Sequence, residues 1–277
     1  MVFRMHTRAI PSTGQALPVI GCGTWLGFDV GGNAIEVAQR GKVLDVLFDA
    51  GGRVIDSSPM YGSAEQVVGE LLGRSADRDK AFVATKVWTT GKRAGIDQME
   101  RSVRLLNCEH IDLMQVHNLV DWQVHLATLR EWKAQRRISY IGVTHYTESG
   151  YAELEAVMRS EPLDFVQFNY SVTHREAEQR LLPLAAERGL AVLANLPFGG
   201  GKLLKALRSK RLPAWAAEIG CDSWNQVLLK FVLAQPAVTC VIPGTSRPDH
   251  MAENAEAGSG PIPEPKWWHG KVGDILT

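Results

Sequence analysis

The fold is decided by three short apolar segments, which read Arg53-Val-Ile-Asp56, Ala81-Phe-Val-Ala-Thr-Lys86 and Ile111-Asp-Leu-Met-Gln-Val-His117. Each segment ends in an ionisable side chain. Asp56 and Lys86 are 30 residues apart, and Lys86 and His117 are 31 residues apart. An interval of about 30 residues is the length of one strand–helix unit. We therefore expect consecutive parallel strands whose ends bring Asp56, Lys86 and His117 to one edge of a sheet.

Strand-like and helical patterns alternate along the chain. The strand candidates are residues 20–23, 54–56, 82–86, 113–117, 140–144, 165–169, 191–195 and 238–242. The helix candidates are residues 33–50, 64–72, 99–106, 122–135, 151–159, 176–188, 224–234 and 248–257. Several strand candidates are apolar on both faces, which is typical of a sheet covered by helices. The pattern predicts an α/β fold, a closed (β/α)8 TIM barrel. A short N-terminal β-hairpin, turned at Thr13-Gly14, precedes it.

The organisation of the chain indicates one domain. No linker or low-complexity segment interrupts the 277 residues, so we expect a single barrel domain over residues 1–277, with residues 259–277 as a C-terminal tail. The chain is 45% hydrophobic and 22% charged, which is ordinary for a globular protein. Its 30 basic and 30 acidic residues cancel, which disfavours nucleic acid and anionic membranes as partners.

Targeting signals and cysteine usage indicate the compartment. The first eight residues are not followed by the apolar core of a signal peptide, and no apolar run approaches the about 20 residues that cross a bilayer. The cysteines Cys22, Cys108, Cys221 and Cys240 are scattered without metal-ligand spacing. Cys22 and Cys240 fall within apolar strand candidates and are expected to be buried thiols. These features predict a cytoplasmic, reduced protein.

The ends of the strands carry the residues from which chemistry is expected, because the active site of such a barrel lies at the C-terminal ends of its strands. Asp56 is the natural partner of Lys86, since a lysine buried at the end of an apolar strand needs an opposite charge. Tyr61 lies in the loop after Asp56. A cationic Lys86 is expected to lower the pKa of Tyr61 from about 10 toward neutrality and make it a general acid. His117 is expected to orient a carbonyl oxygen.

Taken singly, a strand-end Asp–Lys pair or a lone His is more often structural than catalytic. The four residues together at one rim favour catalysis. Polar side chains recur at the remaining strand ends, and they are Thr144, His145, Tyr146, Gln167, Asn169, Asn195 and the segment Pro243-Gly-Thr-Ser-Arg247.

The chain resembles the aldo-keto reductase superfamily over most of its length. The matching segments are Gly21-Cys-Gly-Thr-Trp25, Ile55-Asp-Ser-Ser-Pro-Met-Tyr-Gly62, Ala84-Thr-Lys86, Ile111-Asp-Leu-Met-Gln-Val-His117, Ile141-Gly-Val-Thr144, Val166-Gln-Phe-Asn169, Val241-Ile-Pro-Gly-Thr-Ser246 and Pro248-Asp-His-Met-Ala-Glu-Asn254. The resemblance implies that Asp56, Tyr61, Lys86 and His117 form a catalytic tetrad. In this family Tyr61 would protonate the carbonyl oxygen of an aldehyde or ketone while a nicotinamide hydride attacks the carbon.

The resemblance also implies NADP(H) as cofactor, bound extended across the barrel mouth without a Rossmann fold, with NAD(H) as a possible alternative. Gly21, Gly23 and Gly27 miss the spacing of a Gly-x-Gly-x-x-Gly motif by one residue. The implied cofactor-binding residues are Thr24, Trp25, Thr144, His145, Gln167, Asn195, Gly201, Lys202, Thr245, Ser246, Arg247, Glu253 and Asn254. Two readings stay open for the glycines before Lys202, which either approach the pyrophosphate or form a merely flexible loop.

Three positions depart from the family pattern. Asn195 stands where a tyrosine that stacks on nicotinamide is common, Gly244 where a phosphate-binding lysine is frequent, and His250 where an arginine is common. Arg247 is the expected replacement for the missing charge, and would bind the 2′-phosphate in a charge-assisted fork.

The substrate is less well indicated. The implied substrate-binding residues are Trp25, Trp88, His117 and Asn118. The tail tryptophans Trp267 and Trp268 either fold over the mouth or anchor the tail on the outside of the barrel. His145 and Tyr146 are expected to make the rim polar, which leaves sugars, small dicarbonyls and aryl aldehydes open.

Two other functions stay open. One is a non-catalytic subunit that senses nicotinamide nucleotides, and the other is a Schiff-base lyase or aldolase with Lys86 as the nucleophile. A metal hydrolase is disfavoured and no metal is expected, because no second His or Cys has ligand spacing near His117. The pattern indicates a small-molecule carbonyl substrate and gives no indication of oligomeric state.

Overall fold

The computed structural model describes residues 4–276, so residues 1–3 and 277 of the expected domain lie outside the described part. The strands are β1 (Thr7–Ala9), β2 (Ala16–Pro18), β3 (Cys22–Gly23), β4 (Val54–Asp56), β5 (Phe82–Val87), β6 (Ile111–Val116), β7 (Ile138–His145), β8 (Phe165–Asn169), β9 (Ala191–Asn195) and β10 (Val238–Val241). The helices are α1 (Ala34–Asp49), α2 (Ala64–Arg74), α3 (Lys92–Leu105), α4 (Trp122–Ala134), α5 (Tyr151–Ser160), α6 (Leu181–Arg188), α7 (Lys202–Leu207), α8 (Trp224–Leu233), α9 (Pro248–Glu256) and α10 (Val272–Leu276).

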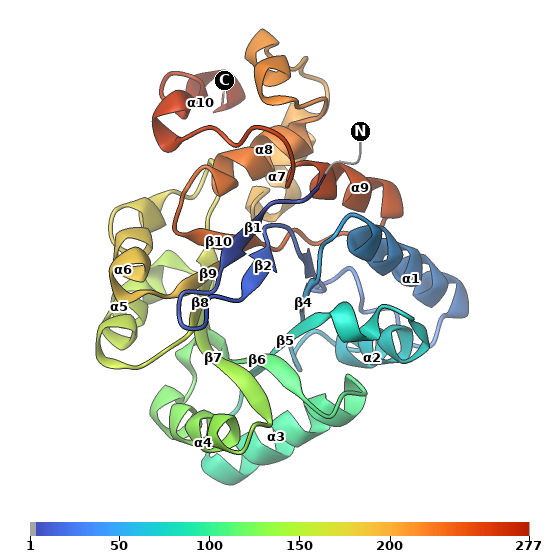
Figure 1. Cartoon of the computed structure of the whole chain (residues 1–277), viewed down its shortest axis with the longest axis vertical. Coiled ribbons are helices and arrows are strands. Elements are labelled where there is room, and N and C mark those ends of the chain that lie inside the picture. The colour runs from blue at the N-terminus through green and yellow to red at the C-terminus, as the bar shows by residue number, and fades with distance from the viewer. Residues whose placement is uncertain (1–3, 277) are drawn as a thin grey trace.

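Strands β3 to β10 form one parallel sheet in chain order. The sheet closes between its first and last strands, where Ile20 bridges Val241 and Gly23 bridges Gly244 in parallel pairing. Across the same seam, the Gly21 N–H donates to the carbonyl of Val241 at 2.9 Å. Figure 1 shows the strands around the centre and the helices outside them. The expected (β/α)8 barrel is confirmed.

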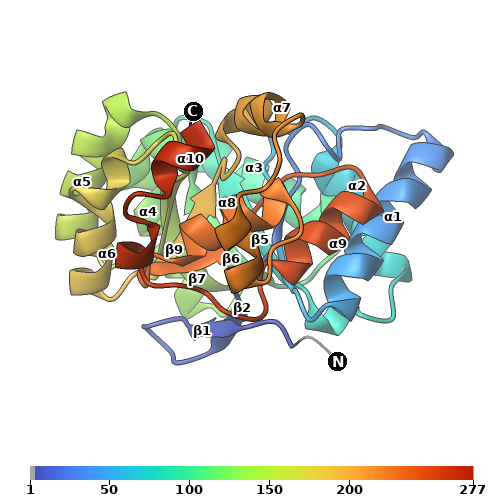
Figure 2. The same cartoon turned by 90° about the horizontal axis from the view of Figure 1, so that it is seen from above.

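The N-terminal hairpin covers one end of the barrel. Strands β1 and β2 pair antiparallel, and Figure 2 shows them beneath the strands, on the side opposite α7. Ile10 and Leu17 of the hairpin belong to the same buried cluster as the inward-facing strand residues Phe82 and Phe165. The Tyr140 hydroxyl from β7 donates to Gln15 Oε1 at 2.6 Å and lies 2.8 Å from the Thr13 hydroxyl. The hairpin therefore closes the N-terminal end of the barrel, and the C-terminal end forms the mouth.

Most element boundaries lie within two residues of the expected ones, and three differences are larger. The expected helix over 176–188 is a 3-10 turn, Glu176–Glu178, followed by α6. Pro183 explains the break, because its ring and missing N–H do not allow an α-helix to run through from the preceding turn. Helix α3 begins at Lys92, earlier than expected, and the structure adds α7 and α10, which the apolar periodicity did not indicate.

The C-terminal tail packs on the outside of the barrel. Trp268 is buried against Trp215 and Phe231, with ring centroids 5.9 and 5.4 Å away. Lys230 of α8 donates to the carbonyls of Ser259 and Pro261 at 2.8 Å each, which fixes the start of the tail. Of the two readings of the tail tryptophans, the anchoring role is the one observed.

Two further expectations concern membranes and cysteines. Over residues 4–276, no helix is long and apolar enough to cross a membrane. Cys22 and Cys240 are buried free thiols, as expected. Burial, followed by the negative charge of Asp56, raises the pKa of Cys22 to about 12, so this thiol is not a nucleophile.

Candidate active site

Three neighbouring strands bring the expected tetrad residues to the mouth. Asp56 is the last residue of β4, Lys86 lies near the end of β5, and His117 follows β6 directly. Because these parallel strands are adjacent in the sheet, their C-terminal ends lie together. Lys86 Nζ donates to Asp56 Oδ2 at 2.8 Å and to the Ser57 carbonyl at 2.7 Å. The structure therefore joins the Asp–Lys pair that the sequence predicted.

The carboxylate of Asp56 is held from three sides. Besides Lys86, it accepts hydrogen bonds from Gln115 Nε2 at 3.3 Å and from Gln167 Nε2 at 3.2 Å. Its side chain and that of Lys86 are 3% and 1% exposed. A buried charge pair is stable only when its remaining donors and acceptors are satisfied, and the two amides supply this for Asp56. Gln115 had not been singled out in the sequence, since nothing in the pattern showed that its side chain turns inward to Asp56.

Lys86 keeps its charge in this environment. Burial lowers the pKa of Lys86, but Asp56 and Tyr61 raise it more, so the pKa lies above the ordinary value for a lysine. The Nζ atom lies 5.2 Å from the centroid of the Tyr61 ring. A Schiff-base lysine needs an unprotonated amine near neutral pH. The ion pair therefore argues against Lys86 as a nucleophile.

The pKa of Tyr61 differs from the expected one. Burial raises the pKa of Tyr61 more than the charge of Lys86 lowers it, so the pKa lies above the usual value for tyrosine. The predicted shift toward neutrality was wrong because the sequence showed the neighbouring cation but not the depth of burial. Tyr61 consequently carries its proton at neutral pH and can donate it.

His117 is uncharged at neutral pH. Burial, followed by the positive charges of Lys86 and His145, lowers the pKa of His117 to about 3. Its Nδ1 lies 3.1 Å from the Ser58 hydroxyl, and its ring stands edge-on to Tyr61 with centroids 6.0 Å apart. If Ser58 donates to Nδ1, the other ring nitrogen carries the proton and is a hydrogen-bond donor beside Tyr61.

Residues with strained backbone conformations are concentrated at the mouth. Within residues 4–276, five of the seven non-glycine residues with positive φ lie in the loops after β3, β6 and β9. They are Leu26, Asn118, Leu119, Asp121 and Leu196. Such conformations cost free energy and are commonest where a binding site imposes them.

Several buried oxygens at the mouth lack partners. Among the described residues, no hydrogen-bond partner is found for Gln167 Oε1, Asn195 Oδ1 or Asn118 Oδ1. Asn118 follows β6 and Asn195 ends β9, while Gln167 lies in the middle of β8 and donates to Asp56. Unpaired buried acceptors are costly unless a ligand supplies donors. Amide and hydroxyl groups, which a nicotinamide dinucleotide carries, are suitable donors.

The backbone of the loop after β9 is accessible to a ligand. Gly199, Gly200 and Gly201 all have positive φ, and a Cβ on Gly200 or Gly201 would meet no atom within 4 Å. The backbone can therefore be approached closely by a ligand at this point. The next residue, Lys202, is exposed at the start of α7.

The candidate cofactor-binding residues after β10 already have partners within the protein. Thr245 Oγ1 accepts from the Arg247 N–H at 3.1 Å. The Arg247 guanidinium is already paired with both carboxylate oxygens of Asp249, one of them at 3.0 Å from Nε. A phosphate at Arg247 would thus compete with Asp249. Asn254 is buried and accepts from Asn225 at 3.4 Å, so it does not lie on an exposed helix face.

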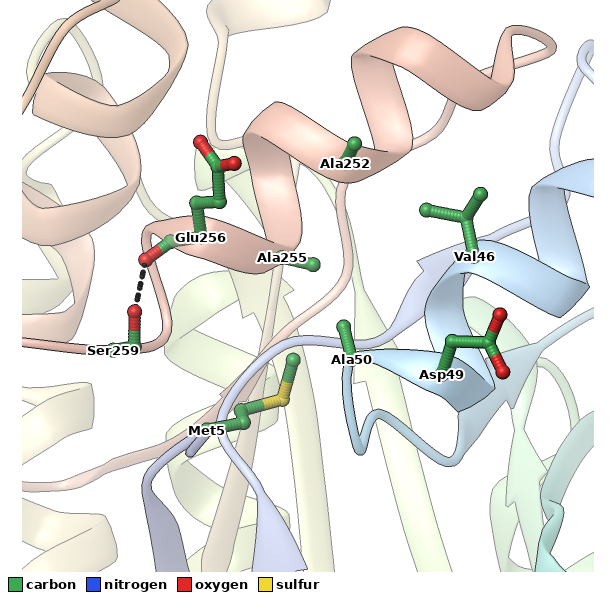
Figure 3. Close-up of a pocket in the computed structure, with 8 residues that line it drawn as sticks. All are labelled: Met5, Val46, Asp49, Ala50, Ala252, Ala255, Glu256 and Ser259. Atoms are coloured by element: carbon green, nitrogen blue, oxygen red, sulfur yellow. Dashed lines mark hydrogen bonds between the residues drawn. The ribbon is translucent and has the colours of Figure 1, made fainter. Parts of the chain in front are cut away.

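The remaining candidates lie around the same mouth. Thr24 donates to the Asp56 carbonyl at 3.0 Å, and Thr144 accepts from the Asn118 N–H at 3.3 Å. Trp25 and Trp88 are largely exposed. The hollow drawn in Figure 3 is a different place, between α1 and α9 on the flank of the barrel, and none of the candidate site residues lines it. Within residues 4–276, no group of His, Cys, Asp and Glu could hold a metal ion.

The chain is similar to known proteins in sequence and in fold. The chain is 30% identical to methylglyoxal reductase of Escherichia coli (strain K12) over 91% of this chain and 89% of that protein. It is 28% identical to aldo-keto reductase str7 of Strobilurus tenacellus, over 80% of this chain and 76% of that protein. An aldo-keto reductase from Klebsiella pneumoniae, solved in complex with NADPH, has a TM-score of 0.81 at 24% identity, covering 99% and 95% of the two chains. The model of the aldo/keto reductase family matches residues 19–267, and the chain belongs to this family.

Proposed function

We propose that the protein reduces the carbonyl group of an aldehyde or ketone to an alcohol with NADPH, using Asp56, Tyr61, Lys86 and His117. The observation that carries this proposal is the position of Lys86, which donates to the buried Asp56 at 2.8 Å and lies 5.2 Å from the centroid of the Tyr61 ring. A neutral phenol next to a cation can donate its proton and remain stabilised as phenolate.

Each tetrad residue has a role that its environment supports. Tyr61 donates its proton to the carbonyl oxygen, and Lys86 stabilises the phenolate that forms. Asp56 keeps Lys86 charged and in place. His117, uncharged, donates a hydrogen bond to the same carbonyl oxygen. A nicotinamide dinucleotide held at the mouth would supply the hydride for the carbonyl carbon.

The cofactor would be held by residues from the strand ends. Gln167 Oε1 and Asn195 Oδ1 offer free acceptors to its carboxamide or hydroxyl donors, beside Thr24, Trp25, Thr144 and His145. Gly201 and Lys202 are suited to the pyrophosphate. The adenosine end of the cofactor would contact residues that follow β10, namely Thr245, Ser246, Arg247, Glu253 and Asn254.

Support for NADP(H) comes from relatives solved with NADPH or NADP. Arg247 is exposed and paired with Asp249, so a 2′-phosphate at Arg247 would have to displace that carboxylate, and NAD(H) is the alternative cofactor. We further propose that Trp25, Trp88, His117 and Asn118 contact the substrate, that residues 1–277 form one domain, and that it acts in the cytoplasm.

Replacement of Tyr61 by Phe tests this function. The variant lacks only the proton donor, so kcat for a reducible aldehyde should fall by about 10²–10⁴. NADPH binding, followed by quenching of tryptophan fluorescence, should be retained. Full activity of Tyr61→Phe would refute the mechanism. Failure of the wild-type protein to bind either NADPH or NADH would refute the function and leave a barrel without its cofactor.

A further inference from the structure

Glu65 is a buried carboxylate that the proposed mechanism does not use. It lies in the first turn of α2 and is 1% exposed. Its Oε1 accepts a hydrogen bond from the Thr85 hydroxyl at 2.5 Å, and its Oε2 accepts one from the Ser102 hydroxyl at 3.1 Å. Because Thr85 belongs to β5 and Ser102 to α3, this one carboxylate joins three elements of the barrel.

The burial of this carboxylate is unfavourable by itself. Burial raises the pKa of Glu65 above its ordinary value, although the hydroxyls of Thr85 and Ser102 and the charges of Lys86 and Arg101 lower it. Apolar side chains in place of a buried charge are often neutral for stability or increase it. The packing of α2 on the barrel therefore does not require a carboxylate here, and the positions of its two partners become the point of interest.

Thr85 connects Glu65 to the tetrad, because it directly precedes Lys86 in β5. Side chains alternate between the two faces of a strand, so Thr85 faces the helices while Lys86 faces the inside of the barrel. The preceding residues follow the same alternation. Val83 belongs to the buried cluster that contains helix residues, and Ala84 belongs to the cluster that contains the hairpin residues. A displacement of Thr85 would therefore displace the backbone of Lys86.

The loop between β4 and α2, which carries Tyr61, is attached to β5 at both of its ends. At its start, the Ser57 N–H donates to the carbonyl of Ala84 at 2.9 Å. At its end, the Tyr61 carbonyl accepts from the Ala64 N–H at 3.1 Å, in the helical turn that contains Glu65. The carboxylate of Glu65 is in turn bound to the residue that follows Ala84 in β5. These two attachments fix the loop relative to the strand.

We propose that Glu65 is a positioning residue, which acts through Thr85 to hold Tyr61 at the distance from Lys86 that proton transfer requires. Lys86 Nζ lies 5.2 Å from the centroid of the Tyr61 ring, and the two residues come from different elements. A misplacement of reacting groups by about 1 Å can lower a rate by about 10². This inference rests on the proposed reductase function and adds to it a residue outside the tetrad.

Two replacements separate positioning from the burial of the carboxylate. Thr85→Val and Ser102→Ala each remove one hydroxyl donor from Glu65, but only Thr85 lies in an element that carries a tetrad residue. The measured quantity is the rate of NADPH oxidation in a single turnover, when the enzyme–NADPH complex meets an aldehyde that the wild type reduces. Thr85→Val should lower this rate by about tenfold or more, with NADPH affinity from tryptophan quenching unchanged. Ser102→Ala should keep the wild-type rate, although urea unfolding should show comparable destabilisation of both variants.

Thr85→Ser is the rescue variant, since it keeps the hydroxyl and loses only a methyl group. It should react at close to the wild-type rate. A wild-type rate in Thr85→Val, an equal loss of rate in Thr85→Val and Ser102→Ala, or a loss in Thr85→Ser as large as in Thr85→Val would overturn the positioning role while leaving the reductase function intact. A wild-type protein that neither binds NADPH nor reduces any aldehyde would instead overturn the function itself.

Discussion

The two ends of the barrel differ in how their polar side chains are satisfied. At the N-terminal end, Asp112 and Asp164 accept hydrogen bonds from strand N–H groups at 2.8 and 2.9 Å. At the mouth, the side-chain oxygens of Asn118, Gln167 and Asn195 have no hydrogen-bond partner among the described residues. The same contrast holds for the backbone, because most of the positive-φ non-glycine residues of residues 4–276 lie at the mouth. One end of each strand is therefore built for stability, and the other carries unsatisfied groups and strain that a ligand can relieve.

The largest difference between the two ends is expected from replacing one lysine at each of them. Lys86 pairs with Asp56 at the mouth with both side chains buried, while Lys133 pairs with Asp164 at the other end with 40% of its side chain exposed. Lys86→Met should lower the free energy of unfolding by about 3–5 kcal/mol, since it leaves a buried carboxylate without its cation. It should also reduce kcat by about 10²–10⁴, because Tyr61 loses the charge that stabilises its phenolate.

Lys133→Met is the matched control and should cost less, about 1 kcal/mol, with kcat unchanged, because Lys133 is partly exposed and the buried Asp164 keeps the hydrogen bond from the Ile141 N–H. Urea unfolding and steady-state kinetics on both variants measure these quantities. Equal losses of stability at the two ends would contradict the contrast.

A second test uses pH. The pKa of His117 is about 3 in the folded protein and about 6.5 when unfolded. The unfolded state therefore binds more protons between these values, and stability falls as pH falls through this window. At about pH 5 the loss attributable to His117 should be about 2 kcal/mol relative to neutral pH.

Urea unfolding at the two pH values should show this loss in the wild type and little of it in His117→Gln. A wild-type slope in His117→Gln would show that other groups cause the acid sensitivity.

The smallest effects are expected from removing one polar group at each end of the barrel. Tyr140→Phe removes the hydroxyl that holds the hairpin and should cost about 1 kcal/mol of stability without changing NADPH affinity. Asn195→Leu removes an unpaired buried oxygen, so it should leave stability unchanged or raise it by about 1 kcal/mol, while weakening NADPH binding. Thermal unfolding and fluorescence titration separate these effects. A destabilised Asn195→Leu variant with normal NADPH affinity would place Asn195 among the structural residues.

The strands were the best predicted part of the molecule. The expected ranges for β4, β8 and β9 agree with the structure to the residue, because each is a short apolar run that ends in a polar residue, namely Asp56, Asn169 and Asn195. Helix α3 was shortened in the prediction because Gly95, Met99 and Ser102 are its only buried positions among the described residues, too few for a clear apolar period. Helix α7 was missed because it is one short segment after three glycines.

The candidate site was predictable as far as strand order determines it. The spacing of Asp56, Lys86 and His117 was sufficient to place them at one rim, because parallel strands end on the same side. Side-chain partners at longer range were not predictable. The pairing of Arg247 with Asp249 depends on rotamers, and the pKa of Tyr61 depends on burial, which the spacing of residues does not report.

The seam that closes the barrel joins residues near opposite ends of the chain. The Val241 N–H donates to the Val19 carbonyl at 2.8 Å, so β10 must be present before the sheet can become a ring. On the ribosome, the growing chain carries an open sheet edge until β10 has emerged, and such edges are prone to aggregation. Completion of the fold, and with it of the mouth, therefore has to wait until β10 has been synthesised, and until then the exposed strands need protection by chaperones.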